Sequence, residues 1–327
     1  MEIETSARLH LSLIDLNGSE GRIDGGIGIC LEEPSIRLEC EENNDKTEII
    51  FDKSIDNIND FNEYSQKIND ACLKMNNYLG SDKTYTFTLK EAYPIHHGLG
   101  LGTQLLLSTG RLIAQLNNKK LDVLQLARIV QRGGTSGIGV KSFESGGFII
   151  DGGHKRDVKS KFLPSSASKV SPPPVLARYD FPKKWNIILA IPEVNKSVSG
   201  QKEIDIFDNY TPVDIGDVER ISYLTLMKLM PAVLEEDMES FGDAVNKIQE
   251  LGFKKIEKNL QKEVITQTIN HMKHMDIPAV GMSSFGPTCF GITDENPKKI
   301  IKELKEVLGT NATVLATHGK NHGSIIK

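Results

Sequence analysis

The stretch from Pro94 to Gln104, Pro-Ile-His-His-Gly-Leu-Gly-Leu-Gly-Thr-Gln, carries the residue types and spacing that most clearly predict chemistry. Gly98, Gly100 and Gly102 stand at alternate positions, directly before a leucine-rich segment with a helical pattern. Glycine lets a backbone approach a ligand closely, and a helix start presents N–H groups and the positive end of the helix dipole. The stretch therefore predicts a phosphate-binding cradle. A glycine-rich turn that binds nothing is the alternative, because short glycine motifs are common.

A second glycine cluster follows at 131–139, Gln-Arg-Gly-Gly-Thr-Ser-Gly-Ile-Gly. Its Arg132 and Ser136 are able to donate hydrogen bonds to phosphate oxygens, the arginine in a bidentate manner. Tight packing of a helix on a strand is the alternative explanation for the glycines. Farther along, the Ser- and Pro-rich stretch 163–174 carries Lys169 among four serines. This composition predicts either an interdomain linker or an ordered anion-binding loop.

Polar side chains near the N-terminus form a third candidate group. Residues 3–14 alternate like a strand, so Arg8 and His10 share one face. The loop that follows carries Asp15 and Asp24. It is either a polar hairpin connection or a loop whose carboxylates meet a ligand; the family resemblance described below favours the second interpretation.

Composition limits the function classes. The chain has 327 residues, of which 39% are apolar and 25% charged, as in globular proteins. Its net charge of −5 argues against nucleic acid as a partner. The four cysteines show no metal-binding spacing and predict reduced thiols in the cytoplasm. No apolar run approaches a membrane span and the acidic start lacks a signal-peptide pattern, so we expect no membrane partner.

The elements that must position these residues follow from hydrophobic periodicity. Strands are predicted at 3–14, 27–31, 35–40, 47–51, 84–89, 185–191, 279–284, 288–292 and 312–316. Helices are predicted at 60–79, 103–116, 121–131, 217–234, 238–251, 263–275 and 297–308. This pattern favours two α+β domains, 1–180 and 181–327, the second with helices on one face of its sheet.

Three spaced motifs resemble those of the GHMP kinase superfamily. The family's Pro-x-x-x-Gly-Leu-Gly-Ser-Ser-Ala resembles 94–103, its late motif resembles 281–290, and its Ser-Gly-x-Asp resembles Ser136-Gly137-Ile138-Gly139. The resemblance implies a GHMP-kinase-like two-domain α+β fold. Its N-terminal domain would be like the second domain of ribosomal protein S5, and its C-terminal domain ferredoxin-like.

The departures from the kinase motifs bear on activity. Leu101 and Gly102 replace the two serines that serve phosphate and magnesium, and Gly139 replaces the catalytic aspartate. A kinase must orient its acceptor hydroxyl and hold Mg²⁺ on the nucleotide, which these residues cannot do. A small-molecule GHMP kinase using ATP is therefore the alternative function, and an inactive binding protein is a third.

A wider set of motifs resembles the β-ribofuranosylaminobenzene 5′-phosphate synthase family within this superfamily. The matching segments are 8–18, 22–28, 98–104, 132–137, 146–154 and 171–174. The resemblance implies a transferase that joins phosphoribosyl pyrophosphate to 4-aminobenzoate or 4-hydroxybenzoate. Pyrophosphate and CO₂ leave, and the C-riboside 5′-phosphate serves tetrahydromethanopterin biosynthesis. The resemblance further implies Mg²⁺ with the pyrophosphate, no organic cofactor, and a homodimer.

This reaction assigns roles to the candidate residues. We expect Arg8, His10, Asp15 and Asp24 to be catalytic, with Asp15 or Asp24 also possible ligands of Mg²⁺. Phosphate or substrate binding is expected at Gly98, Leu99, Gly100, Gly102, Thr103, Gln104, Arg132, Ser136, Gly137, Lys169, Ser284 and Gly286. Further candidates are His97, Glu144 and His154, while a structural role is the common one for a lone histidine such as His96 or His97.

Overall fold

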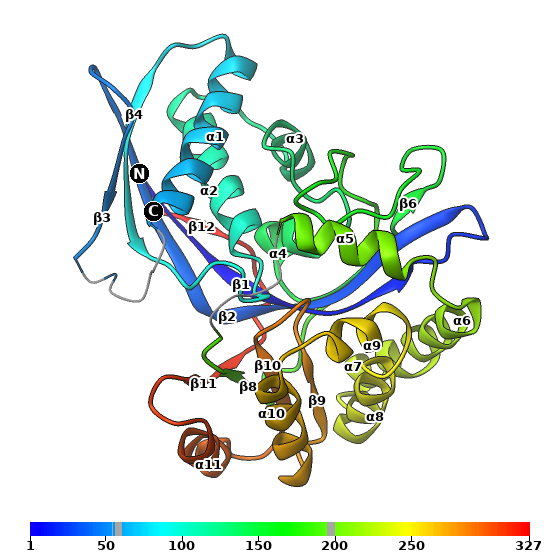
Figure 1. Ribbon diagram of the computed structural model, residues 1–327. Helices are drawn as coiled ribbons and strands as arrows, with labels where there is room; N and C mark the ends of the chain where they lie inside the picture. The colour runs from blue at the N-terminus through cyan, green and yellow to red at the C-terminus, as the bar shows by residue number, and fades with distance from the viewer. Residues whose placement is uncertain (54, 56–60, 195–199) are drawn as a thin grey trace.

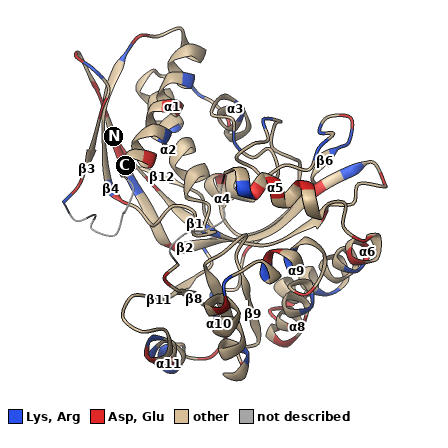
Figure 2. Ribbon diagram, viewed as in Figure 1, with Lys and Arg blue, Asp and Glu red and all other residues tan. Residues whose placement is uncertain are grey.

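The computed structural model describes residues 1–53, 55, 61–194 and 200–327. The chain forms two sheets with helices around them, so the predicted α+β class is confirmed (Figure 1). Lys and Arg residues are interspersed with Asp and Glu residues in the elements around both sheets (Figure 2). No helix in the described part of the chain is long and apolar enough to cross a membrane.

The larger sheet has the strand order β12-β1-β2-β4-β3; in addition, β5 and β6 pair with β2, and β7 pairs with β5. Its strands are β1 (Glu2–Asp15), β2 (Arg22–Asn43), β3 (Glu48–Phe51), β4 (Thr84–Glu91), β5 (Phe148–Asp151), β6 (His154–Lys155), β7 (Val175–Tyr179) and β12 (Ile325–Ile326). The prediction of separate strands at 27–31 and 35–40 is wrong. The two segments form one strand, because pairing with β1 resumes at Ser35 after Pro34.

Helices pack against this sheet around the glycine-rich stretch. They are α1 (Phe61–Leu79), α2 (Leu101–Leu116), α3 (Val123–Ile129) and α4 (Ile138–Ser145). α2 and α4 contact β1 and β2, and α1 packs on α2. Covered on several sides, α2 buries apolar residues all round, as its run of leucines predicts.

The second sheet has the order β11-β8-β10-β9, all antiparallel. Its strands are β8 (Asn186–Ile191), β9 (Ala279–Met282), β10 (Cys289–Thr293) and β11 (Thr313–His318). The helices of this half of the chain are α5 (Gln201–Tyr210), α6 (Ile215–Leu224), the π-helical turn η1 (Thr225–Leu229), α7 (Met230–Glu235), α8 (Met238–Ile248), α9 (Gly252–Asn259), α10 (Glu263–His274) and α11 (Lys298–Leu308). α8, α10 and α11 contact the second sheet, whereas α6 and α9 contact β1 of the first.

The expectation that helices cover one face of this sheet is wrong. Ile188 and Ala190 of β8 pack with residues of α10 and α11, while Ile187 and Leu189 point the other way into the main core with α8. Both faces are therefore buried, which explains why β8 is apolar at every position after Asn186. The predicted division at residue 180 stays a prediction.

Candidate functional site

The glycine-rich stretch forms a tight loop that starts α2. Gly98 and Gly100 have φ of +73° and +84°, and Gly100 is the N-cap of the helix. A Cβ on Gly98 would lie 2.2 Å from the Ser283 carbonyl oxygen, and one on Gly100 would lie 3.1 Å from Arg8 Cγ. Both positions therefore require glycine. A Cβ on Gly102 would meet only side-chain atoms 3.7 Å away or farther, so no backbone constraint explains that glycine.

Two distant segments hold this loop in place. Arg8 of β1 donates a hydrogen bond from Nη1 to the Gly98 carbonyl at 2.6 Å, and Ser283 Oγ donates to the same oxygen at 2.7 Å. The backbone N–H of His10 donates to Ser283 Oγ at 3.0 Å, and the N–H of Ser284 donates to the His10 carbonyl at 3.0 Å. The structure thus joins the N-terminal strand, the glycine loop and the late motif.

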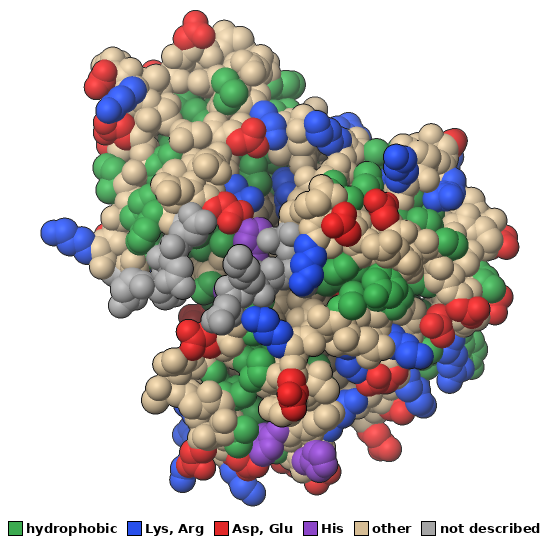
Figure 3. Space-filling view, viewed as in Figure 1, with side chains coloured by type: hydrophobic (Ala, Val, Ile, Leu, Met, Phe, Trp, Pro, Cys, Tyr) green, Lys and Arg blue, Asp and Glu red, His purple; other side chains and the backbone are tan. Residues whose placement is uncertain are grey.

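The loop opens onto a cavity of about 200 Å³, which we call the cradle cavity. It brings together many of the predicted residues: Arg8, His10, His97, Gly98, Leu99, Gly100, Gly102, Thr103, Arg132, Ser136, Ser284 and Gly286. His96 and Leu101 also line it. The first residues of α2 line this space, and the start of a helix attracts an anion. The surface is hollowed in this region, and Lys, Arg and His side chains lie in the hollow (Figure 3).

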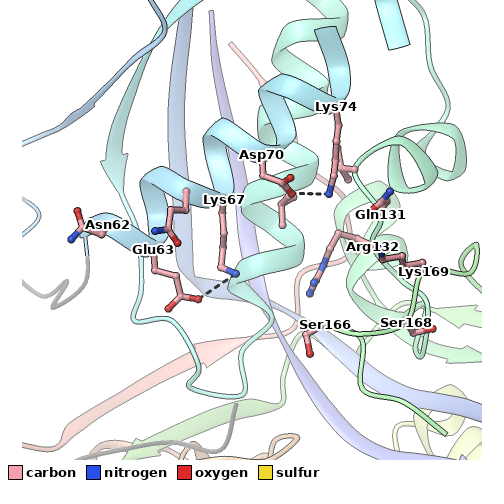
Figure 4. A pocket seen from close by; sticks show the side chains of 13 residues that line it. Asn62, Glu63, Lys67, Asp70, Lys74, Gln131, Arg132, Ser166, Ser168 and Lys169 are labelled. Carbon is pink, nitrogen blue, oxygen red and sulfur yellow. Dashed lines mark hydrogen bonds and ion pairs between the residues drawn. The ribbon is translucent and has the colours of Figure 1, made fainter. Parts of the chain in front are cut away.

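A second cavity of about 650 Å³ adjoins the first, because both are lined by Lys67, Arg132 and Ser166. Its wall also includes Lys74 and Lys169. Lys67 and Arg132 reach into the same space, with Ser166 nearby (Figure 4). The stretch 163–174 is packed rather than a free linker, since Ser168 is buried and donates to the Gly134 carbonyl. Its place in the wall agrees with the anion-binding interpretation.

Arg132 is fixed by Thr103. The Thr103 hydroxyl oxygen accepts hydrogen bonds from Arg132 Nε at 3.2 Å and from Nη2 at 3.1 Å. A Cβ on Gly139 would lie 3.1 Å from Thr103 Cγ2, so the glycine leaves room for this threonine. The position that carries an aspartate in the kinase motif therefore has no side chain and faces the cradle cavity.

Burial shapes the charges of the cradle cavity. It lowers the pKa of Arg8 to about 10, and the nearby Arg132 acts in the same direction. The pKa of His10 falls well below its usual value because the ring is buried and lies near the cations Arg8 and Lys254. His10 is therefore neutral at pH 7, and positive charge in the cavity comes from Arg8, Arg132 and Lys67.

Two carboxylates that the sequence interpretation missed also line this cavity. Burial raises the pKa of Glu203 on α5 to about 7, with Glu257 acting in the same direction and Arg132 against it. Burial also raises the pKa of Glu257 on α9, which forms a buried ion pair with Lys254. Neither α5 nor α9 is predicted above. Glu203 and Phe207 are four residues apart, and this helical spacing is the sequence signal for α5.

Several predicted residues line neither cavity. Asp15 Oδ1 accepts the backbone N–H groups of Asn17 and Gly18, both at 2.8 Å, and so closes the hairpin turn. Gln104 is buried between the Thr5 hydroxyl and the Gly139 carbonyl. Glu144 lies at the surface in an ion pair with Lys141.

Asp24 lies in a buried charged cluster behind the cradle cavity. Its carboxylate contacts His154 Nδ1 at 2.7 Å and Lys159 Nζ at 3.0 Å. Lys159 also donates to the Thr135 hydroxyl at 3.1 Å. Nearby, Asp151 accepts hydrogen bonds from Ser136 Oγ and from the N–H of Gly137. These contacts place Asp24, His154 and Gly137 in the support of the site.

Comparisons with known proteins agree with this architecture. The GHMP kinases N-terminal domain family matches residues 66–147, and the GHMP kinases C-terminal family matches residues 229–309. Homoserine kinase from Cytophaga hutchinsonii superposes with a TM-score of 0.71 at 14% identity, covering 99% of this chain and 96% of its own. Mevalonate kinase of L. major gives 0.71 at 12% identity, covering 99% and 97%.

Curated relatives match over nearly the full length. The β-ribofuranosylphenol 5′-phosphate synthase of Methanothermobacter thermautotrophicus is 49% identical over 99% of this chain and 98% of its own. The proteins of the same name from Methanocaldococcus jannaschii and Archaeoglobus fulgidus are 44% and 40% identical; each match covers 99% of this chain, and 99% and 98% of the relative. The chain belongs to the GHMP kinase superfamily and, within it, to the β-ribofuranosylphenol 5′-phosphate synthase family.

Proposed function

We propose that the protein joins phosphoribosyl pyrophosphate to 4-hydroxybenzoate with release of pyrophosphate and CO₂. The observation that carries this proposal is full-length identity of 40–49% to three synthases. The word phenol in the relatives' name favours the hydroxy acid over 4-aminobenzoate, since a phenol product retains a ring hydroxyl. The C-riboside would then serve tetrahydromethanopterin biosynthesis.

The two adjoining cavities support phosphoribosyl pyrophosphate as the substrate, because this molecule carries phosphate groups at both ends. The start of α2 with Arg8 and Arg132 would bind one group, and Lys67, Lys74 and Lys169 would bind the other. Departure of pyrophosphate leaves positive charge on C1 of the ribose and negative charge on the leaving group. Preorganised N–H groups and buried arginines stabilise that leaving charge.

We further propose that Mg²⁺ enters with the pyrophosphate. Within the described residues no group of three or more His, Cys, Asp or Glu side chains is arranged to hold a metal ion. Asp24 is already engaged by Lys159 and His154. Substrate oxygens and water fit Mg²⁺ better than either Asp15 or Asp24, since this ion keeps several waters and binds phosphates. Bound there, Mg²⁺ would neutralise charge on the leaving group.

A cytoplasmic homodimer is the state that we propose for the enzyme. The four cysteines are free and buried, which supports a reducing compartment. Exposed Tyr223, Leu226, Met227 and Leu234 lie together on the run from α6 to α7, where each is 58–60% exposed. An apolar surface of this kind is typical of a subunit interface.

The reaction is tested with purified protein, Mg²⁺, phosphoribosyl pyrophosphate and carboxyl-labelled 4-hydroxybenzoate. We expect equal amounts of labelled CO₂ and pyrophosphate. Consumption of phosphoribosyl pyrophosphate without labelled CO₂ would contradict the proposal. In parallel, ADP formation from ATP and sugar alcohols would favour the kinase alternative, against which Gly139 argues. Substrate binding without either product would indicate the inactive binding protein.

A further inference from the structure

The cradle cavity has an aromatic wall as well as cations. Glu203 and Phe207 lie four residues apart on α5, so they share one face of the helix, and both line the cavity. Phe285 lines it from the turn between β9 and β10, and its ring centroid lies 6.3 Å from that of Phe207. Phe253 packs behind both rings, at 4.6 Å and 5.9 Å. A flat apolar ligand at this wall would meet two aromatic rings and the Glu203 carboxylate.

We propose that Phe207 and Phe285 bind the ring of the benzoate substrate and that Glu203 is the general base that accepts its phenol proton. This inference rests on the proposed function and adds the residues that recognise and activate the aromatic substrate. Aromatic pairs favour offset or edge-to-face contacts, which the tilted rings of this wall provide.

The proton transfer has a defined place in the reaction. As the ring carbon that bears the carboxylate forms its bond to C1, the C1–oxygen bond breaks and pyrophosphate leaves with the electron pair. The phenol O–H gives its proton to Glu203, so the ring becomes a neutral dienone instead of a cation. Loss of CO₂ returns the electron pair of the carbon–carboxyl bond to the ring, and Glu203 returns its proton to the oxygen. Glu203 therefore ends in its starting form.

The surroundings of Glu203 suit a base that works near neutral pH. Burial and the neighbouring Glu257 raise its pKa, Arg132 and a hydrogen bond from Ser166 lower it, and the balance is about 7. The titratable and charged groups that line the cavity with Glu203 are Arg8, His10, Lys67, His96, His97, Arg132 and Glu257. A carboxylate with this pKa accepts a proton more readily than an ordinary glutamate does.

Glu257, the other carboxylate of the cavity, has a different role. It is paired with Lys254 on the same helix, and Lys254 Nζ also donates to the Ser284 carbonyl at 3.0 Å. This pair connects α9 to the turn that carries Phe285. Its carboxylate is neutralised locally, whereas the Glu203 carboxylate is balanced by the more distant Arg132.

The test compares Glu203→Gln with Asp208→Asn, which removes an exposed carboxylate from the same helix. With 4-hydroxybenzoate we expect E203Q to lower kcat/KM by about 100-fold or more, the usual loss for a general base. The KM for phosphoribosyl pyrophosphate should change little. In the unmodified enzyme kcat/KM should fall as the pH drops below about 7, because protonated Glu203 cannot accept a proton. The Glu203→Asp variant should show the same decrease in kcat/KM at low pH, and Asp208→Asn should behave like the unmodified enzyme.

A more acidic substrate separates a chemical role from a structural one. A phenol that is already ionised, such as 3,5-difluoro-4-hydroxybenzoate at pH 8, needs no base. The ratio of unmodified to E203Q activity should therefore shrink to less than about tenfold with this substrate. An equal loss with both phenols, or an unchanged pH profile in E203Q, would overturn the assignment. If the proposed reaction itself is wrong, the unmodified enzyme will release no CO₂. That outcome is distinguishable from a failure of the Glu203 assignment alone.

Discussion

At the residue scale, Arg132 links the two cavities. Its guanidinium lies in the wall of both, and Thr103 holds it at the first turn of α2. Burial lowers its pKa, but an arginine stays charged at neutral pH all the same. The side chain is therefore a preorganised cation beside the helix start, with no need to reorient when an anion arrives.

Replacing Arg132 by alanine should weaken binding of phosphoribosyl pyrophosphate by about tenfold or more, because a hydrogen bond to a charged group is worth roughly 1.5–3 kcal/mol. Isothermal titration measures the change. Arg128→Ala is the matched control, since Arg128 is exposed on α3 and donates a hydrogen bond to the Ser171 hydroxyl at 3.1 Å. Equal affinity in the Arg132→Ala variant and the unmodified protein would show that Arg132 does not bind this substrate.

At the scale of elements, the buried cluster of Asp24, His154 and Lys159 connects the start of β2 to the segments around the cavity. Lys159 is 4% exposed and Asp24 is 1% exposed. Lys159 Nζ reaches Asp24, the Thr135 hydroxyl and the Leu163 carbonyl, which belong to three separate segments. The Lys159 ammonium group thus holds Thr135 and the chain around Leu163 next to the start of β2.

Lys159→Met should lower the free energy of unfolding by about 3–5 kcal/mol, because it removes the ammonium partner of the buried Asp24 carboxylate. Urea denaturation measures this loss. The double variant Asp24→Asn/Lys159→Met should recover part of it, since the buried charge is gone and asparagine tolerates the positive φ of position 24. Lys155→Met, an exposed lysine on β6, provides the control. A Lys159→Met variant as stable as that control would refute the buried-pair argument.

At the scale of the whole molecule, the C-terminal residues return to the first sheet. The termini lie side by side in Figure 1, and β12 pairs with β1. The Lys320 N–H donates to the Cys30 carbonyl at 2.9 Å, and its carbonyl accepts from the Gly147 N–H at 2.7 Å. Its Nζ donates to the Ser6 hydroxyl at 2.9 Å in a buried setting. The last nine residues therefore stabilise strands that begin the chain.

Removing residues 319–327 should loosen β1 and β2, although the deletion is at the opposite end of the sequence. We expect backbone amides in 1–12 and 28–34 to exchange hydrogen at least about tenfold faster, since several hydrogen bonds worth roughly 1 kcal/mol each are lost. Mass spectrometry of exchanged peptides measures this effect. Removing only 325–327 should affect 1–5 and spare 28–34. Unchanged exchange after the longer deletion would contradict the predicted coupling.

The sequence by itself determined the α+β class, the glycine loop that starts α2 and the superfamily, because these depend on local patterns. Glycine spacing, helix starts and strand alternation depend on a few neighbouring residues. The local structure of 94–104 and of most strands and helices can therefore be predicted from the sequence. Short α5 and α9 are not, because their stability comes from packing more than from their own residues. The same holds for β2, which pairing with β1 carries past Pro34.

Only the tertiary structure decided which polar residues meet. Arg8, Arg132 and Ser284 come together over long sequence separations, while Asp15 closes a turn and Asp24 pairs with Lys159. Glu203 enters the same cavity from a segment in which the sequence shows no motif, whereas Phe285 enters it from the late motif at 281–290. The reason is physical: a charged side chain takes its role from its burial and its partners, and both are set by packing between distant segments.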